Sequence, residues 1–557
     1  MYRQRSVWSG LRPDVGSERS GVCSAASRLE RRDRLAPWVL VLLVAAGFLF
    51  PPPAHPIEVP LIGPIPADIG SIELSYSGEQ ELPSVTFIPP SDVVSSPSYR
   101  LPLLSADLVA SLHATQVFGS CKGEFVRKDG EPTARVSFAG AAGERCGVRI
   151  ELRPDSGILD IMSYSTIRLR GRAVGQVVVA LEDRAKSMRE DNVPLAKVSG
   201  TFDLTIPLRE LGRSLDLRKV TALVVTTEEP QASVILDQLV LLQHHSGSAY
   251  PTTTGIWAWR FREALEDPDA IFAICQRYRY SRVALQMPAW SESEQIWAAY
   301  ARLLVQMQAK GIDAVALDGY PEAVQEPQKI AQKIQRLLDL MAPAVLAGVQ
   351  LDIEPYLRPG FFEDESGPRL YLEAIDIIGQ TIGRRTRLSV VMPFWLATPT
   401  VGGRPLAFAV MDRADEVVVM SYRTNLDEVK AISEDILRYG DLIGLPVWLA
   451  LETVKLPVER YVTLKRELQV HLADAVLDRA QHRLMFAPFS PPLLEGDQRE
   501  GFRIHHRSTV RPERVTFAGR HRSDVEKAAK TLLGTIGHRS LSGVMIHDFD
   551  GFRALTE

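Results

Sequence analysis

The chain has little of the chemistry that marks several common classes of protein. Its 557 residues contain four cysteines, and no cysteine or histidine spacing resembles a structural zinc site. Its net charge is only −4, and beyond residue 56 it has no basic groove or tail of the kind that binds nucleic acid. No glycine-rich phosphate loop follows the first strand-like run of the C-terminal half. We therefore expect no metal, no cofactor and no nucleic-acid partner.

Long apolar runs are also scarce, and the one at residues 36–50 follows a tail, residues 1–35, that carries eight arginines. Arginines on one side of an apolar run stay in the cytoplasm. The run has the length of a signal-peptide core and is short for a membrane helix, which needs about 20 residues. We expect everything after it to be exported, to the periplasm or another extracytoplasmic compartment. The sequence leaves open whether residues 36–50 are cleaved or remain as a signal anchor in the inner membrane.

The length predicts several domains, because single cores stop growing at roughly 250–300 residues. Residues 51–69 are rich in proline and are interpreted as a linker. From 70 to 245, short alternating runs separated by turn residues predict an all-β sandwich. Within it, Cys121 and Cys146 flank strand-like runs and could pair outside the cytosol. Residues 215–225 and 232–241 resemble the closing strands of galactose-binding-like jelly rolls, which include many carbohydrate-binding modules.

The pattern changes at residue 250, where strand-like runs begin to alternate with amphipathic helical segments. Such alternation predicts parallel strands joined by helices, and eight units in about 300 residues fit a (β/α)₈ TIM barrel over residues 250–557. Two helices show capping boxes, Ser291 with Glu294 and Ser523 with Glu526. A long insertion, about 455–520, separates the last two strands. The predicted strands are 255–259, 282–286, 314–318, 348–352, 387–392, 416–420, 447–451 and 543–547.

Polar and aromatic side chains follow the predicted strands, at the barrel end where active sites lie. Carboxylates that transfer protons and aromatic rings that hold sugars are the parts of a glycoside hydrolase site. For any one of these residues outside the fourth strand, a rim salt bridge or a helix cap is an equally good explanation. The set is Trp257, Trp259, Gln286, Asp318, Asp352, Glu354, Trp395, Tyr422, Arg423, Glu452, His547 and Asp550.

The fourth strand gives the sharpest signal. Asp352 and Glu354 lie two apart on an extended chain, so their side chains point the same way with Cα atoms roughly 6–7 Å apart. Two neighbouring carboxylates repel each other, which raises one pKa and keeps an acid protonated near neutral pH. A chance surface pair is the competing explanation, but this pair ends an apolar run. We predict a catalytic role for both.

Three motifs resemble glycoside hydrolase family 18, the chitinases and their relatives. Residues 348–356 resemble that family's fourth-strand Asp-Gly-x-Asp-x-Asp-x-Glu, residues 418–422 its sixth-strand Met-x-Tyr-Asp, and residues 542–550 its eighth-strand Gly-Gly-x-Met-x-Trp-x-x-Asp. The resemblance implies that Glu354 is the general acid that protonates the leaving glycosidic oxygen. It implies that Asp352 orients the substrate's 2-acetamido group, which attacks the anomeric carbon, and that Tyr422 hydrogen-bonds the acetamido carbonyl. The expected substrate is a polysaccharide that contains amino sugars.

The chain departs from the family pattern at four positions. Ala347 and Gln350 replace the first two aspartates, Arg423 replaces the sixth-strand aspartate, and His547 replaces the eighth-strand tryptophan. These changes argue against chitin itself, because the lost groups shape the site around an N-acetylglucosamine ring. An arginine beside the site would suit an acidic sugar.

Three other functions stay open. Glu354 as acid/base with Glu452 as nucleophile would give a covalent retaining mechanism, if the two carboxyl groups lie about 5–5.5 Å apart. A barrel that binds glycans without cleaving them is the second. The third is an exported scaffold with partners in exopolysaccharide synthesis or secretion.

Overall fold

The structure is a computed structural model of the whole chain. It describes residues 57–557 except 62–64, 66–68, 70, 78–83, 89–98, 101–104, 110–111, 113–114, 128–132, 153–157, 184–192, 244–249, 251, 359, 363, 469–471 and 487–498. The arginine-rich tail 1–35, the apolar run 36–50 and the start of the predicted linker lie outside these residues. Within the described ranges, no helix is both long and apolar enough to cross a membrane.

The described residues fall into two compact units. One combines the residues before Val93 with Pro457–Pro512, and the other combines Val93–Leu456 with Glu513–Glu557. The second unit holds the barrel and the sandwich, so the chain is multidomain and β-rich.

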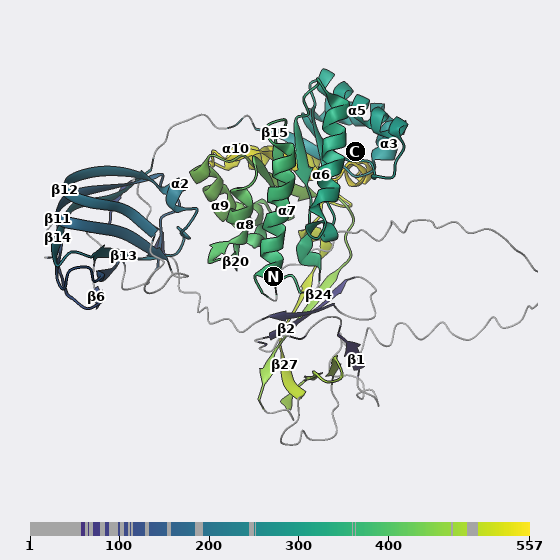
Figure 1. Cartoon of the computed structure of the whole chain (residues 1–557). Helices are drawn as coiled ribbons and strands as arrows, with labels where there is room; N and C mark the ends of the chain where they lie inside the picture. Colours follow the sequence, from purple (N-terminus) through teal and green to yellow (C-terminus); the bar gives the residue numbers. More distant parts are fainter. Residues whose placement is uncertain are drawn as a thin grey trace, which may run out of the picture. The chain divides into compact units, whose positions relative to one another are not determined.

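Eight parallel strands close into a barrel in the second unit, as predicted (Figure 1). Their residues are almost all buried, because helices cover the outside and side chains fill the inside, which explains the continuous apolar runs in the sequence. The strands are β15 (Thr253–Ala258), β16 (Arg282–Gln286), β17 (Asp313–Asp318), β18 (Gly348–Leu351), β19 (Leu388–Pro393), β22 (Glu416–Met420), β23 (Val447–Glu452) and β28 (Leu541–His547).

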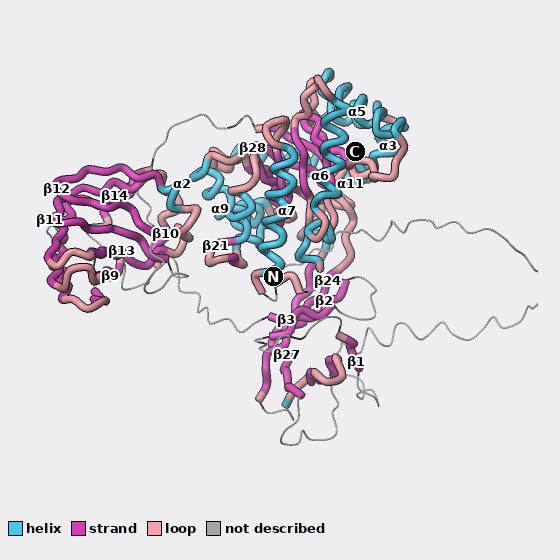
Figure 2. Tube along the Cα trace, viewed as in Figure 1, coloured by secondary structure: helices cyan, strands magenta, loops and turns pink. Residues whose placement is uncertain are grey.

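Helices and short 3₁₀ turns connect the strands of the barrel (Figure 2). They are α3 (Phe261–Glu266), α4 (Pro268–Tyr278), α5 (Glu294–Ala309), η3 (Pro321–Val324), α6 (Pro327–Met341), η4 (Pro355–Leu357), α7 (Ser366–Ile382), η5 (Phe394–Ala397), α8 (Leu406–Met411), α9 (Leu426–Ile443), η7 (Pro512–Arg514), α10 (Arg522–Thr535) and α11 (Phe549–Ala554), with a small hairpin of β20 (Thr400–Val401) and β21 (Arg404–Pro405) before α8.

The two predicted capping boxes are wrong by two residues. Ser293, not Ser291, caps α5 and accepts a hydrogen bond from the Ile296 N–H. His521, not Ser523, caps α10 and forms a capping box with Asp524. Ser293 lies two positions after Ser291, and His521 lies two positions before Ser523. Each has the extended backbone that an N-cap needs.

The barrel end where the strands begin is closed by a buried ion pair. Arg282 at the start of β16 bonds Glu416 at the start of β22, at 2.5 Å, and its guanidinium lies 4.2 Å from the centre of the Trp448 ring. Because both charges are buried and satisfied by each other, this end has a structural role. The chemistry therefore has to be sought at the opposite end.

The region that the sequence predicted as a sandwich forms one sheet of eleven strands among the described residues, and we keep the name sandwich for it. The long strand β11 pairs with β14 along its first half and with β13 along its second half, so it connects both parts of the sheet. A disulfide joins Cys121 and Cys146, the pair that the sequence suggested. The strands are β4 (Tyr99–Arg100), β5 (Ser105–Asp107), β6 (Thr115–Phe118), β7 (Lys122–Val126), β8 (Ala134–Ala139), β9 (Cys146–Glu151), β10 (Leu159–Asp160), β11 (Thr166–Asp183), β12 (Val193–Pro207), β13 (Val220–Thr227) and β14 (Gln231–Leu242), with one short helix, α2 (Leu208–Leu211).

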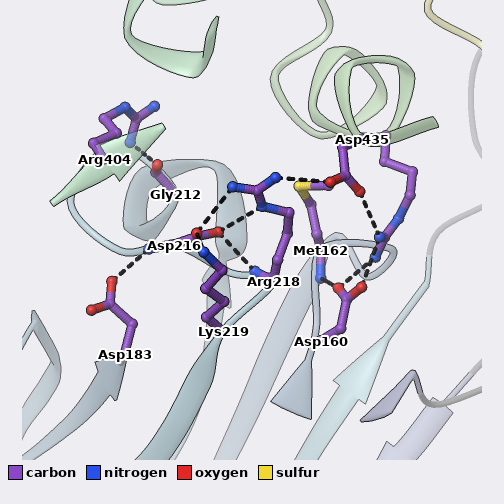
Figure 3. Close-up of polar contacts among 10 residues, drawn as sticks. Asp160, Met162, Asp183, Gly212, Asp216, Arg218, Lys219, Arg404 and Asp435 are labelled. Carbon is purple, nitrogen blue, oxygen red and sulfur yellow. Dashed lines mark hydrogen bonds and ion pairs between the residues drawn. The ribbon is translucent and has the colours of Figure 1, made fainter. Parts of the chain in front are cut away.

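Two arginines join the sandwich to helix α9 of the barrel within the same unit, one of them through a fully buried ion pair. Arg438 on α9 bonds both carboxylate oxygens of Asp160 on β10, at 2.8 and 2.5 Å, and donates to the Ser163 hydroxyl. Arg218 bridges Asp216 of the sandwich and Asp435 of α9 (Figure 3). Sequence patterns could not predict this contact, because its partners are more than 200 residues apart.

The insertion and the N-terminal strands form one sheet, and here the structure differs from the predicted domain boundaries. Residues 57–60, placed in the linker, and 71–77 and 84–88, placed in the sandwich, pair instead with insertion strands. The sheet order is β1-β26-β25-β27-β24-β2-β3. Its members are β1 (Ile57–Pro60), β2 (Ser71–Ser77), β3 (Ser84–Ile88), β24 (Glu459–Glu467), β25 (Ala475–Asp478), β26 (Arg483–Phe486) and β27 (Arg499–Val510).

A shared apolar core explains this pairing. Ile72 and Leu74 of β2 are fully buried against Leu464, Leu477 and Phe502 of the insertion. Neither set of strands could bury its apolar face alone, so both require the other.

Candidate functional site

Asp352 lies directly after β18, at the end of the barrel opposite the Arg282–Glu416 pair. Its backbone N–H bonds the Asp318 carbonyl at 2.9 Å, and its Oδ1 is buried without a hydrogen-bond partner among the described residues. Burial, and then the charge of Glu354, raise the pKa of Asp352 to about 8, although His547 acts in the opposite direction. The carboxyl group therefore holds its proton at neutral pH.

The backbone at Asp352 is closely approached by Gly319, which follows β17. A Cβ at position 319 would lie 2.1 Å from the Asp352 carbonyl oxygen. A glycine is therefore needed there for the ends of β17 and β18 to meet.

Glu354 is the second acid of the pair and is only 6% exposed. Its Oε1 accepts a hydrogen bond from the Tyr356 hydroxyl at 2.7 Å. Burial, followed by the charges of Glu354 and Asp352, raises the pKa of Tyr356, so its phenol remains a donor. The contact stabilises Glu354 as a carboxylate.

Aromatic rings surround Glu354 on one side. The Tyr356 ring packs edge-on against partly buried Trp395, with centroids 4.8 Å apart, and Phe362 lies 6.0 Å from Trp395. Tyr356 and Phe362 were not among the predicted site residues. The spacing Glu354-x-Tyr356 is the signal that could have found Tyr356.

Tyr422 follows β22 and comes close to the carboxylates from other strands. Burial first, then Glu452, Asp352 and Glu354, raise its pKa. Its ring centroid lies 5.8 Å from that of His547. Tyr422 is therefore a protonated donor next to the Asp352–Glu354 pair, as the resemblance implies for a group that binds a carbonyl.

His547, Glu452 and Trp259 form a connected group from three strands. His547 Nδ1 lies 2.9 Å from Glu452 Oε2, and Trp259 Nε1 lies 3.0 Å from His547 Nε2. Glu452 is 3% exposed, and its Oε1 also accepts the backbone N–H groups of Thr453 and Val454. The contacts of Glu452 with His547, Thr453 and Val454 fix its carboxylate in place.

Other predicted residues are engaged elsewhere. Trp257 is 1% exposed and bonds Gln350 inside the barrel, so its ring is not available for stacking on a sugar. Asp318 forms an ion pair with Lys333 at 2.5 Å, and Gln286 is partly buried at the end of β16. The Asp318 pair matches the rim salt bridge that the sequence left open.

Arg423 follows β22 and Asp550 follows β28. Arg423 is buried, donates to the Tyr422 carbonyl at 2.6 Å and lies 3.5 Å from Glu428. Asp550 lies in the first turn of α11 and pairs with Arg260 at 3.3 Å. Together with Trp259 and Arg260, Asp550 lines a cavity of about 220 Å³.

Among the residues that the structure describes, no group of three or more His, Cys, Asp or Glu side chains is placed so that it could hold a metal ion. Three of the acidic groups at the strand ends are instead bonded to other side chains: Glu354 to Tyr356, Glu452 to His547 and Asp318 to Lys333. The arrangement can hold a proton on one carboxyl group and present another carboxylate beside it.

No family model and no curated protein matches the chain. Among solved structures, the spore cortex-lytic enzyme SleL of Bacillus cereus is similar at 10% identity and a TM-score of 0.30, over 57% of this chain and 76% of that one. The CBM22-1-GH10 modules of Clostridium thermocellum endo-1,4-β-D-xylanase 10B, complexed with xylohexaose, are similar at 9% identity and a TM-score of 0.28. This match covers 79% of this chain and 89% of that one. The family 11 carbohydrate-binding module of Clostridium thermocellum Lic26A-Cel5E is similar at 14% identity and a TM-score of 0.19. This match covers 25% of this chain and 95% of that one. Scores this low assign neither a fold nor a function to the chain.

Proposed function

We propose that this chain is a carbohydrate-active protein, a glycoside hydrolase whose catalytic centre lies at the mouth of a (β/α)₈ TIM barrel related to family 18. The observation that carries the proposal is the Asp352–Glu354 pair, in which one carboxyl group holds a proton to a pH of about 8 beside another carboxylate. Pairs of carboxyl groups whose environments separate their proton affinities are the acid and base of glycosidases. The substrate is a polysaccharide that contains amino sugars.

The mechanism begins with the proton on Asp352 and a hydrogen bond from Tyr356 to Glu354. When a 2-acetamido group enters, the proton passes from Asp352 to Glu354. Asp352 then stabilises the acetamido nitrogen, and Tyr422 donates to the acetamido carbonyl. The acetamido oxygen attacks the anomeric carbon, and the leaving oxygen takes the proton from Glu354. A water that gives its proton to Glu354 opens the cyclic intermediate, with retention of configuration.

The contacts of Glu452 disfavour the mechanism in which it is a nucleophile. A nucleophilic carboxylate needs an oxygen that can reach the anomeric carbon of a bound sugar, and Glu452 is only 3% exposed. Both oxygens of Glu452 bond His547, and Oε1 also accepts two backbone N–H groups. We therefore assign Glu452 to positioning His547.

Glycan binding without cleavage is the second candidate. It is favoured by the Tyr356–Glu354 hydrogen bond, which stabilises the ionised form of the group that should act as the acid. Both candidates use the same site and differ only in whether a bond is broken.

We further propose that the sandwich is a jelly roll that acts as a carbohydrate-binding module, and that the chain is exported to the periplasm or another extracytoplasmic space. Residues 36–50 support export, as a signal peptide or as an inner-membrane anchor. An exported glycosidase with a second sugar-binding domain fits partners in exopolysaccharide synthesis or secretion.

The proposal is tested by release of reducing ends from soluble polysaccharides, each offered with its 2-acetamido groups intact and after deacetylation. We expect wild-type protein to cleave at least one acetylated polymer and to lose that activity on its deacetylated form. Asp352→Asn should reduce turnover, while Glu373→Gln, an exposed change on α7, should not. Equal cleavage of both forms would exclude the acetamido mechanism. Binding without any cleavage would establish the second candidate.

A further inference from the structure

His547 uses both of its ring nitrogens. Nδ1 faces Glu452, and Nε2 faces the indole N–H of Trp259 at 3.0 Å. His547 ends β28, Glu452 ends β23 and Trp259 follows β15, so the group joins three neighbouring strands of the barrel.

The chemistry of the indole determines where the histidine proton lies. A tryptophan N–H only donates, so His547 Nε2 must accept and cannot carry a proton in this contact. In the neutral ring the single proton is then on Nδ1 and is donated to Glu452. Protonation at Nε2 would set two N–H donors against each other and break the contact with Trp259.

Trp259 is the tryptophan of this group that a ligand could reach. It is partly buried and lines the cavity of about 220 Å³, whose other lining residues include Arg260 and Asp550 and come mostly from α3, α4 and α11. Trp257, by contrast, is enclosed in the barrel interior. An indole face beside polar groups is the usual platform for a sugar ring.

We propose that Glu452 and His547 are positioning residues that hold Trp259 as a platform for a sugar ring, and that protonation of His547 at Nε2 releases this platform. The sugar as ligand rests on the proposed function. The position of the proton and its link to Trp259 rest on geometry alone.

Opposing effects act on the pKa of His547. Burial lowers it, and the acidic groups that face the ring raise it, to about 9; these are Glu452 at the end of β23, Asp548 after β28 and, once it has lost its own proton, Asp352 after β18. Tyr422 is the other titratable side chain against the ring and is neutral. The Trp259 hydrogen bond lowers the pKa of His547, because it is made only with the neutral ring.

The test is an NMR titration of the full chain with labelled histidine and tryptophan, in which the His547 signal is identified by its loss in His547→Gln. Trp259→Phe removes the N–H and should raise the pKa of His547 by about 0.5–1 unit. Glu452→Gln removes the charge and should lower it by at least about 1 unit. Glu373→Gln should leave it unchanged. The proposal would be overturned if Trp259→Phe and Glu452→Gln shifted the pKa of His547 in the same direction, or if Trp259→Phe left this pKa unchanged.

The platform is tested separately with hexa-N-acetylchitohexaose, by calorimetry above and below the measured His547 pKa. Wild-type affinity should fall about tenfold or more at the lower pH, as the Trp259 indole N–H signal moves. His547→Gln keeps an acceptor for Trp259 but cannot be protonated, so its affinity should vary little. The same pH dependence in both proteins would overturn the platform. Absence of binding by wild type would overturn it only if the NMR titration also failed to show the opposite pKa shifts. Absence of binding together with opposite pKa shifts in the NMR titration would place the failure in the proposed function instead.

Discussion

Asp352 and Glu354 differ in their surroundings although they are two residues apart. Asp352 has a buried oxygen without a partner in the described part of the chain, whereas Glu354 receives a hydrogen bond from Tyr356. A buried carboxyl group without a hydrogen-bond donor resists ionisation, whereas a donor stabilises the ionised form. The proton of the pair therefore rests on Asp352 until a ligand supplies a partner.

The raised pKa of Asp352 makes stability depend on pH in a defined direction. The folded protein holds this proton to about pH 8, while an unfolded aspartate loses it near pH 4, so folding becomes less favourable as pH rises between these values. Asp352→Asn should remove this loss of folding stability at high pH, because asparagine has no acidic proton to lose. We expect the variant to match wild type near pH 4 and to exceed it by about 5 kcal/mol at pH 9 in chemical denaturation, because each unit of pKa shift corresponds to about 1.4 kcal/mol. A stability difference that does not vary with pH would contradict the shifted pKa.

The sequence predicted the acid pair because strand geometry places residues two apart on the same side. It could not predict which predicted residues are bonded elsewhere, since this depends on contacts from distant strands. Trp257 looked like a sugar platform but bonds Gln350, 93 positions away. Asp318 looked like a site acid but pairs with Lys333 on the following helix.

Among the elements, the strands of the barrel were predictable and the contacts between domains were not. Buried parallel strands are continuous apolar runs, and all eight were predicted to within a few residues. The contact of α9 with β10 depends on charges that look like ordinary surface residues in the sequence. Arg438 and Asp160 are nevertheless 3% and 4% exposed.

The Arg438–Asp160 pair should show the energetics of a buried ion pair. Arg438→Met leaves the Asp160 carboxylate buried without its partner and should lower the free energy of unfolding by about 3–5 kcal/mol, and adding Asp160→Asn should restore much of that loss. The exposed pair Arg168–Asp203 is the matched control, and breaking it should have little effect. Equal losses from the two pairs would show that the domain contact is not held by Arg438.

At the scale of the whole molecule, strands of the insertion pair with strands near the described N-terminus to form one sheet. Strands β2 and β24 are paired although their residues are nearly 400 positions apart in the sequence. Local patterns carry no information on such pairing, so the sequence suggested a linker and a sandwich where the structure has this sheet.

Removal of residues 1–92 should therefore unfold the insertion. Its strand β24 would lose its partner β2, and Leu464 and Phe502 would be exposed to water. Hydrogen exchange in residues 457–512 should become fast. Removal of residues 1–56 is the control and should leave exchange in this segment slow, because β1–β3 are retained. Slow exchange in both proteins would show that the insertion folds without the N-terminal strands.

The central claim is that Glu354 transfers a proton to a glycosidic oxygen, and Glu354→Gln tests it most directly. The glutamine keeps the size of the side chain and can still bond Tyr356, but it cannot act as an acid. On a polysaccharide that wild type cleaves, we predict that the variant loses at least about 100-fold in release of reducing ends while its affinity is unchanged. Turnover at the wild-type rate in Glu354→Gln would contradict the account.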